Sequence, residues 1–155
     1  MTRRGLFVTV WLAALAFVIA PAPARAASCS FVSVTGVSFG TYDVFASGST
    51  DSAGSLSYSC SGGATVTIAL SLGNAPSYDP RLLLKLGGAS IDYNLYLDAA
   101  RNTIWGDGVG LTGLYSPIAP ADGVTVTVPI FGRIPAGQDA SVGAYTDTIT
   151  ATINF

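Results

Sequence analysis

The side chains that carry most enzyme chemistry are scarce in this sequence. It contains no His, and its nine acidic residues are all Asp, because no Glu is present. The common general bases are therefore reduced to Asp and a single lysine, Lys85. From this composition we expect no catalytic residue, no cofactor and no metal site, and we interpret the protein as something other than an enzyme.

Three small groups of residues could still form a catalytic or binding site. Asp92 and Asp98 lie six residues apart on one face of an alternating segment, which allows a paired-carboxylate site. Gly106-Asp107-Gly108 allows a calcium loop, although no oxygen ligands recur at alternating positions around it. Arg133 allows a carboxylate-binding site. Asp at strand ends, Asp in a glycine turn and Arg in an ion pair are common structural uses, and we favour them here.

The amino-terminal residues have the pattern of an export signal. Arg3 and Arg4 precede an uncharged apolar run over residues 6–20, and Ala24-Arg25-Ala26 supplies a small-residue cleavage pattern. The run is shorter than the roughly 20 residues that span a bilayer. The sequence predicts a signal peptide over residues 1–26 and one exported domain over residues 27–155, with no membrane insertion after cleavage. Its sparse, mildly acidic charge argues against nucleic acid as a partner.

Both cysteines lie in the predicted mature chain. Cys29 and Cys60 are the only two cysteines, and in an exported protein two cysteines most simply form one disulfide. This bond would tie the first predicted strand to the second. A catalytic or metal-bound thiol is the rival interpretation, and the sequence offers no His to support it.

Period-two alternation runs through the mature chain, and helical periodicity is absent from it. We expect a loop over residues 46–54, and one strand interrupted at Gly62-Gly63 over residues 55–60 and 64–72. Pro129 favours an edge position or a bulge. Short strands separated by turn residues predict an all-β antiparallel sandwich. The predicted strands cover residues 30–39, 55–60, 64–72, 81–86, 91–97, 124–134 and 143–155.

The segment over residues 143–155 has the clearest alternation. One face carries apolar residues, with Asp147 as the single exception, and the other face carries Thr and Asn. The apolar face consists of Tyr145, Ile149, Ala151, Ile153 and Phe155. No later segment is expected to pair with this strand, so one of its edges needs a cover from elsewhere.

Four stretches in order resemble the spore coat protein U domain family. Tyr93 to Asp98 and Trp105 to Gly108 resemble its central "Y-x-L-Y-x-D … W-G-x-G" signature. Residues 131–138 (FGRIPAGQ) resemble its "y-G-R-I-P-x-G-Q" segment, and residues 143–147 (GAYTD) resemble its closing "G-x-Y-x-D" strand. The matching motif positions are Tyr93, Tyr96, Asp98, Trp105, Gly106, Gly108, Gly132, Arg133, Tyr145 and Asp147.

The resemblance implies an incomplete immunoglobulin-like, pilin-type sandwich that the archaic chaperone–usher route secretes and assembles. In such subunits a groove beside the last strand is filled first by a periplasmic chaperone. A strand from a neighbouring subunit, delivered at the outer-membrane usher, then replaces the chaperone. The family therefore implies that Tyr145, Ile149, Ala151, Ile153 and Phe155 line this groove, and that the protein ends in a cell-surface fibre.

One departure from the family pattern bears on the position in such a fibre. Cleavage after Ala26 would leave only Ala27 and Ser28 before Cys29, about 7 Å of chain, which is too short for a donor strand. We therefore expect a subunit that receives a strand without supplying one, at the tip or cap, with a role in adhesion and biofilm.

Two other functions stay open at this point. One is a secreted coat or matrix protein that self-associates without a fibre. The other is a small sugar-binding module, in which Tyr96 and Trp105 would stack on sugar rings. The sequence also leaves open whether residues 109–114 supply the missing strand from within the chain.

Overall fold

Every regular element in the described part of the chain is a strand. The computed structural model describes residues 26–117 and 122–155, so the predicted signal peptide lies almost entirely outside the described residues. The strands are β1 (Ser28–Thr35), β2 (Thr50–Ser61), β3 (Thr67–Leu70), β4 (Arg81–Lys85), β5 (Ser90–Tyr96), β6 (Ile104–Trp105), β7 (Thr112–Gly113), β8 (Thr125–Ile134), β9 (Tyr145–Thr146) and β10 (Ala151–Asn154). The predicted all-β class is confirmed.

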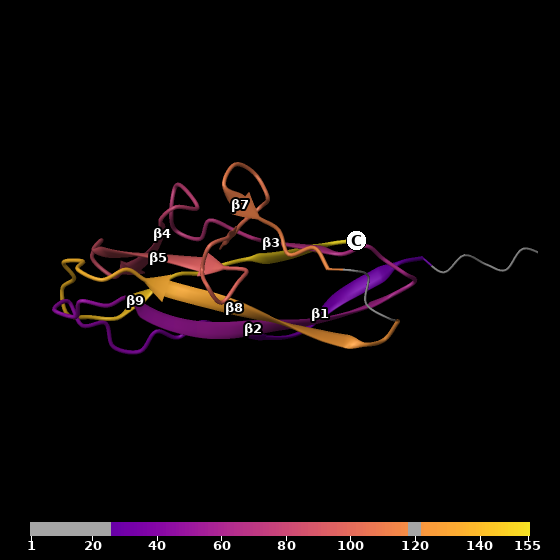
Figure 1. Cartoon of the computed structure of the whole chain (residues 1–155), viewed down its shortest axis with the longest axis horizontal. Coiled ribbons are helices and arrows are strands. Elements are labelled where there is room, and N and C mark those ends of the chain that lie inside the picture. Colours follow the sequence, from indigo (N-terminus) through magenta and orange to yellow (C-terminus); the bar gives the residue numbers. More distant parts are fainter. Residues whose placement is uncertain (1–25, 118–121) are drawn as a thin grey trace, which may run out of the picture.

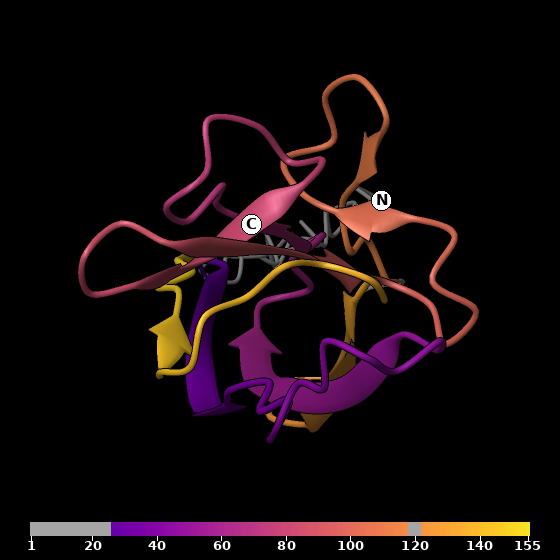
Figure 2. The same ribbon diagram turned by 90° about the vertical axis from the view of Figure 1, so that its left-hand side faces the viewer.

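The strands form two sheets that together make a curled, immunoglobulin-type sandwich. The large sheet has the order β1-β2-β8-β5-β4-β9, with β6 added to β5 and β7 added to β6, and the small sheet pairs β10 with β3. All pairings are antiparallel except the short β6–β7 pair. The large sheet curls so strongly that β1, at one edge, approaches the segment that contains β9 and β10 (Figures 1 and 2).

Alternating side chains separate the core from the outer surface. Along β2 the core receives Leu56, Tyr58 and Cys60, which are 1%, 0% and 4% exposed. Burial raises the pKa of the Tyr58 hydroxyl to about 12. The outward positions of β1, β2 and β8 are mostly Ser and Thr, and the hydroxyls of Ser57 and Thr127 lie 2.8 Å apart. Small hydroxyl side chains tolerate water on a sheet face while keeping strand geometry.

The second predicted strand differs from the observed one in two ways. β2 begins at Thr50, so the loop predicted over residues 46–54 is wrong for its second half. Gly54 fits there because a Cβ would lie 2.4 Å from the carbonyl oxygen of Thr35, so the close approach of β1 requires glycine. Residues 55–60 and 64–72 do not form one interrupted strand. Gly62 and Gly63 both have positive φ angles and turn the chain from the large sheet into the small one.

Pro129 lies inside β8, which is a central strand, and its surroundings explain why it is tolerated. β8 pairs with β2 over ten residues, and Pro129 lies opposite Ser55 in that register. On the other side, β5 pairs only with Phe131, Gly132 and Arg133. At Pro129, β8 is therefore locally an edge, and proline costs no ladder hydrogen bond on the open side.

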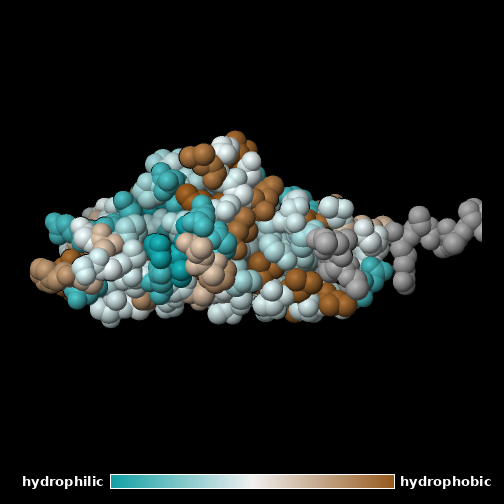
Figure 3. All heavy atoms as spheres, in the orientation of Figure 1, coloured by the Kyte–Doolittle hydropathy of each residue, from teal (hydrophilic) through white to brown (hydrophobic). Residues whose placement is uncertain are grey.

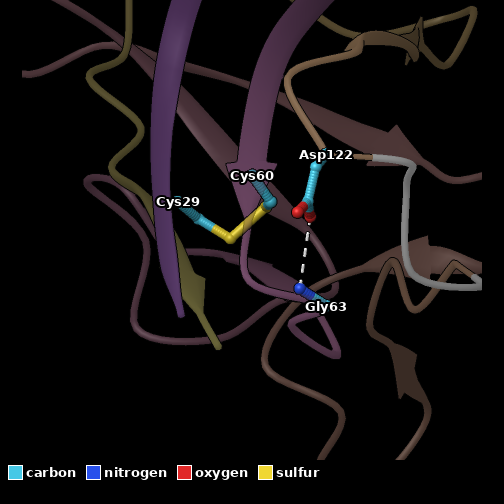
Figure 4. Close-up of a disulfide and its surroundings, with 4 residues drawn as sticks. All are labelled: Cys29, Cys60, Gly63 and Asp122. Atoms are coloured by element: carbon cyan, nitrogen blue, oxygen red, sulfur yellow. Dashed lines mark hydrogen bonds between the residues drawn. A yellow bond between two sulfur atoms is a disulfide. The ribbon is translucent and has the colours of Figure 1, made fainter. Parts of the chain in front are cut away.

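The disulfide lies at the end of the molecule where the chain enters the sandwich. Cys29 and Cys60 are bonded with a sulfur–sulfur distance of 2.06 Å, and they face each other in the β1–β2 register. Beside them, the amide of Gly63 donates a 3.3 Å hydrogen bond to the Asp122 carboxylate (Figure 4). The predicted pairing is confirmed, and it ties β1 to β2.

Reduction of this disulfide should lower the free energy of unfolding by about 3–4 kcal/mol, because the bond closes a loop across a sequence separation of 31 residues. Urea unfolding of the purified protein with and without reductant measures the difference. Equal unfolding midpoints in the two conditions would show that β2, rather than the disulfide, holds β1 in place.

Candidate functional site

A long groove of about 1070 Å³ runs between two parts of the chain that are far apart in sequence. Its first wall is residues 36–45, which follow β1, and its second wall is residues 140–151, which contain β9 and the start of β10. Apolar side chains of the core form the floor between them. The floor residues are Leu56, Leu70, Leu83, Ile91, Tyr93, Leu95, Ile130 and Ile134. The groove is therefore a gap in the wall of the sandwich that reaches down to its core, whose side chains stay buried, with Leu95 and Ile130 only 5% and 6% exposed.

Both walls present backbone groups with no ladder partner on the groove side. Residues 36–45 belong to no β-ladder, and their one turn hydrogen bond runs from the amide of Ala46 to the carbonyl of Asp43. The second wall is paired along its far edge only, by β4 to β9 and by β3 to β10. Two unpaired backbone edges thus face each other across an apolar floor, which is the arrangement that an inserted strand completes.

Tyr93 lies at the floor of the groove and contacts both walls. Its ring packs edge-on against the ring of Phe39 in the first wall, with 6.0 Å between centroids. Its hydroxyl donates a 2.6 Å hydrogen bond to the Asp147 carboxylate in the second wall. Burial, and then this hydrogen bond to an anion, raise the pKa of Tyr93 far above its usual value. Tyr93 therefore stays neutral and fixes the separation of the walls at this point.

Asp147 explains why the last strand is broken into β9 and β10. Its carboxylate points inward and accepts hydrogen bonds from the amides of Asn74 and Thr148, at 2.9 and 2.7 Å, in addition to that from Tyr93. A Cβ at Gly73 would lie 2.1 Å from the same carboxylate, so only glycine fits beside it. The side chain of Asp147 thus replaces backbone pairing where the loop between β3 and β4 bulges away.

Side chains hold the first wall in place. The hydroxyl of Tyr42 donates to the carbonyl of Pro135 at 2.9 Å and accepts from the amide of Gln138 at 3.0 Å. Gln138 in turn bonds the backbone of Asp92 in β5 through both ends of its amide, at 2.7 and 2.9 Å. Gly132 lies under the wall, where a Cβ would come within 2.7 Å of the rings and methyls above it. This wall is anchored without any strand pairing.

The five predicted groove residues have different positions. Tyr145, Ile149 and Ala151 line the groove, and all three are half-buried. Ile153 packs against the core beyond the groove, at the disulfide end of β10. Phe155 is 56% exposed and does not line the groove.

The three constellations considered for chemistry have structural roles here. Asp98 closes a turn by accepting hydrogen bonds from the amides of Thr103 and Asn102, and these bonds hold the pKa of its carboxyl below its usual range. Asp107 accepts from the amide of Val109 at 2.9 Å, as expected for a turn. Among the described residues, no group of three or more His, Cys, Asp or Glu side chains could hold a metal ion.

Arg133 forms the predicted ion pair. Its guanidinium donates two hydrogen bonds to Asp51, at 2.7 and 2.8 Å, and holds the pKa of that carboxyl below its usual value. Trp105 is fully buried and donates from its indole nitrogen to the carbonyl of Ile68, so the idea that it stacks on sugar is wrong. Tyr96 is half-buried. No helix in residues 26–117 or 122–155 is long and apolar enough to cross a membrane.

The missing strand does not come from residues 109–114. Thr112 and Gly113 form β7, which pairs with β6 on a projection above the sandwich (Figure 1). The strand predicted over residues 30–39 is wrong for residues 36–39, because β1 ends at Thr35 and the first wall that follows joins no ladder. Sequence reasoning missed the rest of this wall, including Tyr42 and Phe45, because residues 40–45 have no strong alternation. Gln138, which supports this wall, did carry a signal, since it closes the "G-R-I-P-x-G-Q" stretch.

Removal of the Tyr93–Asp147 hydrogen bond should weaken the second wall. Tyr93→Phe should lower the free energy of unfolding by about 1–2 kcal/mol, because the bond joins a buried hydroxyl to a carboxylate. Asp147→Ala should cost about 2–3 kcal/mol, because it removes the hydrogen bonds from the amides of Asn74 and Thr148 as well as that from Tyr93. Urea unfolding measures both, with Thr148→Ala on the exposed face as the control. Losses no larger than that of the control would contradict this role.

Comparison with known proteins agrees with the architecture. Residues 14–152 match the model of the Spore Coat Protein U domain, a match that begins inside the predicted signal peptide. "Protein U" of Myxococcus xanthus is 36% identical over 143 residues, covering 83% of this chain and 78% of that protein. The fold is similar, with a TM-score of 0.58 and 21% identity, to a chain in the CsuC–CsuE chaperone–tip adhesion subunit pre-assembly complex of Acinetobacter baumannii Csu pili. The match covers 83% of this chain and 40% of that one. This chain belongs to the Spore Coat Protein U domain family.

Proposed function

We propose that this chain is an exported, pilin-like structural subunit whose groove is completed by a strand from another protein. A periplasmic chaperone fills the groove first, and a neighbouring subunit fills it after passage through an outer-membrane usher. The single observation that carries the proposal is the pair of unpaired backbone edges that face each other across the apolar floor. An inserted strand would pair with both edges and cover the floor with alternate side chains.

The solved complex supports this proposal by analogy of fold. That complex holds a chaperone and a tip adhesion subunit of an archaic chaperone–usher pilus before assembly. The groove leads down to core side chains such as Leu95 and Ile130, so a strand inserted during export would add apolar contacts that the open groove lacks. No catalytic step enters the proposal, and the protein acts by being assembled.

A charge placed in the groove should block complex formation. Ala151→Asp should abolish co-purification with the periplasmic chaperone of the host's own chaperone–usher system, because the inserted strand would bury an unpaired carboxylate. Thr150→Asp adds the same charge to the exposed face of the same strand and should leave the complex intact. Co-expression in the periplasm followed by affinity purification measures both variants. Equal yields of complex for the two variants would contradict a groove-bound strand.

We further propose that the subunit lies at the tip or cap of its fibre. The support is the position of β1, which begins at Ser28, two residues after the predicted cleavage site at Ala26. If the signal peptide over residues 1–26 is removed there, the mature chain of residues 27–155 has no extended segment ahead of β1 to donate. The fold likeness to a tip adhesion subunit is consistent with this position.

Immunogold labelling of assembled fibres tests the position. The label should lie at one end of each fibre, and mass spectrometry of the same material should give a mature chain that begins at Ala27. Labels repeated along the shaft would contradict the tip assignment, and so would a mature chain that keeps a longer segment before Cys29.

A further inference from the structure

Five apolar side chains are at least 71% exposed in loops, and only two of them adjoin the groove. The five are Phe45, Leu86, Val109, Leu111 and Val142, which are 93%, 99%, 71%, 92% and 97% exposed. In the space-filling view, apolar side chains gather at the apex of the projection near β7 and at the lower right, with a smaller group at the left-hand end (Figure 3). Scattered exposed apolar residues are common on proteins, so exposure alone singles out none of them.

Phe45 and Val142 differ from the other three because they line the groove from opposite sides. Phe45 ends the first wall and Val142 lies near the start of the second, so the pair flanks the end of the groove far from the disulfide. Leu86, Val109 and Leu111 do not line it. An extended occupant that reaches from Ala151 to Val142, nine residues apart in the sequence, needs a length of at most about 30 Å, because this wall bends at residues 142–143.

Hydrogen bonds fix the loops that carry the pair. The amides of Phe45 and Ala46 donate to the side chain and the carbonyl of Asp43, at 2.9 and 3.2 Å. On the other side, the ammonium of Lys85 donates to the carbonyl of Val142 at 2.6 Å and to the hydroxyl of Ser141 at 3.1 Å. The two apolar side chains are therefore held in water before any partner arrives, and little loop ordering is needed on binding.

We propose that Phe45 and Val142 form an end clamp, which closes on a large apolar residue at the end of the inserted strand. The inference rests on the proposed function, and it adds a length and an end residue to the partner. A partner strand fits when about nine extended residues cover the floor and its end residue beside Gly143 is large and apolar. A strand with a small polar residue at that end leaves both clamp residues in water and binds more weakly.

Two synthetic peptides test the clamp on the purified full-length chain. Both are nine residues long with alternating Val and Thr. One has Leu at both ends and the other has Ser at both ends, so either strand direction brings the same residue to the clamp. Calorimetry or fluorescence polarisation should show the Leu-ended peptide binding about ten-fold tighter. This preference should fall to about two-fold in Phe45→Ser and in Val142→Ser, because each variant removes one side of the clamp.

Leu86→Ser is the matched control, since Leu86 is as exposed as the clamp residues but lies off the groove. It should keep the ten-fold preference. A preference that survives in Phe45→Ser and Val142→Ser, or that is lost equally in Leu86→Ser, overturns the clamp. A dimer of the free chain that Phe45→Ser dissociates also overturns it, because the pair would then bind a second copy.

A different result would contradict the proposed function, as distinct from the end clamp. If Ala151→Asp leaves the binding of both peptides unchanged, the peptides do not occupy the groove, and the groove itself is not a strand-binding site. If Ala151→Asp abolishes binding of both peptides while the clamp variants change nothing, the groove stands and the clamp is wrong.

Discussion

Backbone hydrogen bonding along the last strand is satisfied on one side only, and the rest of the structure is arranged around that deficit. β3 and β4 pair with the far edge of the strand, while its near edge faces the groove. The opposite wall, residues 36–45, likewise joins no ladder. A buried backbone group without a hydrogen-bond partner costs free energy. The backbone groups along both edges of the groove therefore need hydrogen bonds either from water or from an inserted strand.

Most of the floor is built from strands that do not pair with the walls, which explains how the sandwich can stay folded around an open groove. β2 and β8 pair over ten residues, and β5 joins β8 beside them, so the floor strands share continuous ladders. Arg81 adds a buried cross-link, since its guanidinium donates to Asn94 in β5 and to the carbonyls of Ser71 and Trp105. The first wall, in contrast, is attached through side chains such as Tyr42, while the second wall keeps backbone pairing to β3 and β4. The first wall can therefore adjust to an occupant more readily than the second.

Period-two alternation predicted the inward positions of Tyr145, Ile149 and Ala151, but not that Phe155 is exposed, and it could not predict where pairing stops. Asp147 was visible as a polar residue on an apolar face, and its role depends on Asn74 and Tyr93, which are distant in sequence. The disulfide was predicted from the expected export of the chain and from its having two cysteines. β2 was predicted too short because Thr50 to Gly54 has the composition of a loop, and only its pairing with β8 makes it a strand. Tertiary pairing overrode local composition there.

The first wall shows the harder limit on prediction from sequence. Residues 40–45 join no ladder and include a positive-φ glycine and a turn, so their short alternation did not indicate a strand, although Tyr42 and Val44 are half-buried. The segment is identified by residues distant in sequence that hold it in place. Gly132 leaves room beneath it, and Gln138 donates a hydrogen bond to Tyr42. The same reasoning applies to the groove ends: Phe45 looks like any exposed loop residue until the opposite wall places Val142 across from it. This site thus consists of backbone edges that the fold leaves without a pairing strand. Sequence alternation mainly detects strands that are paired, so it does not reveal such a site.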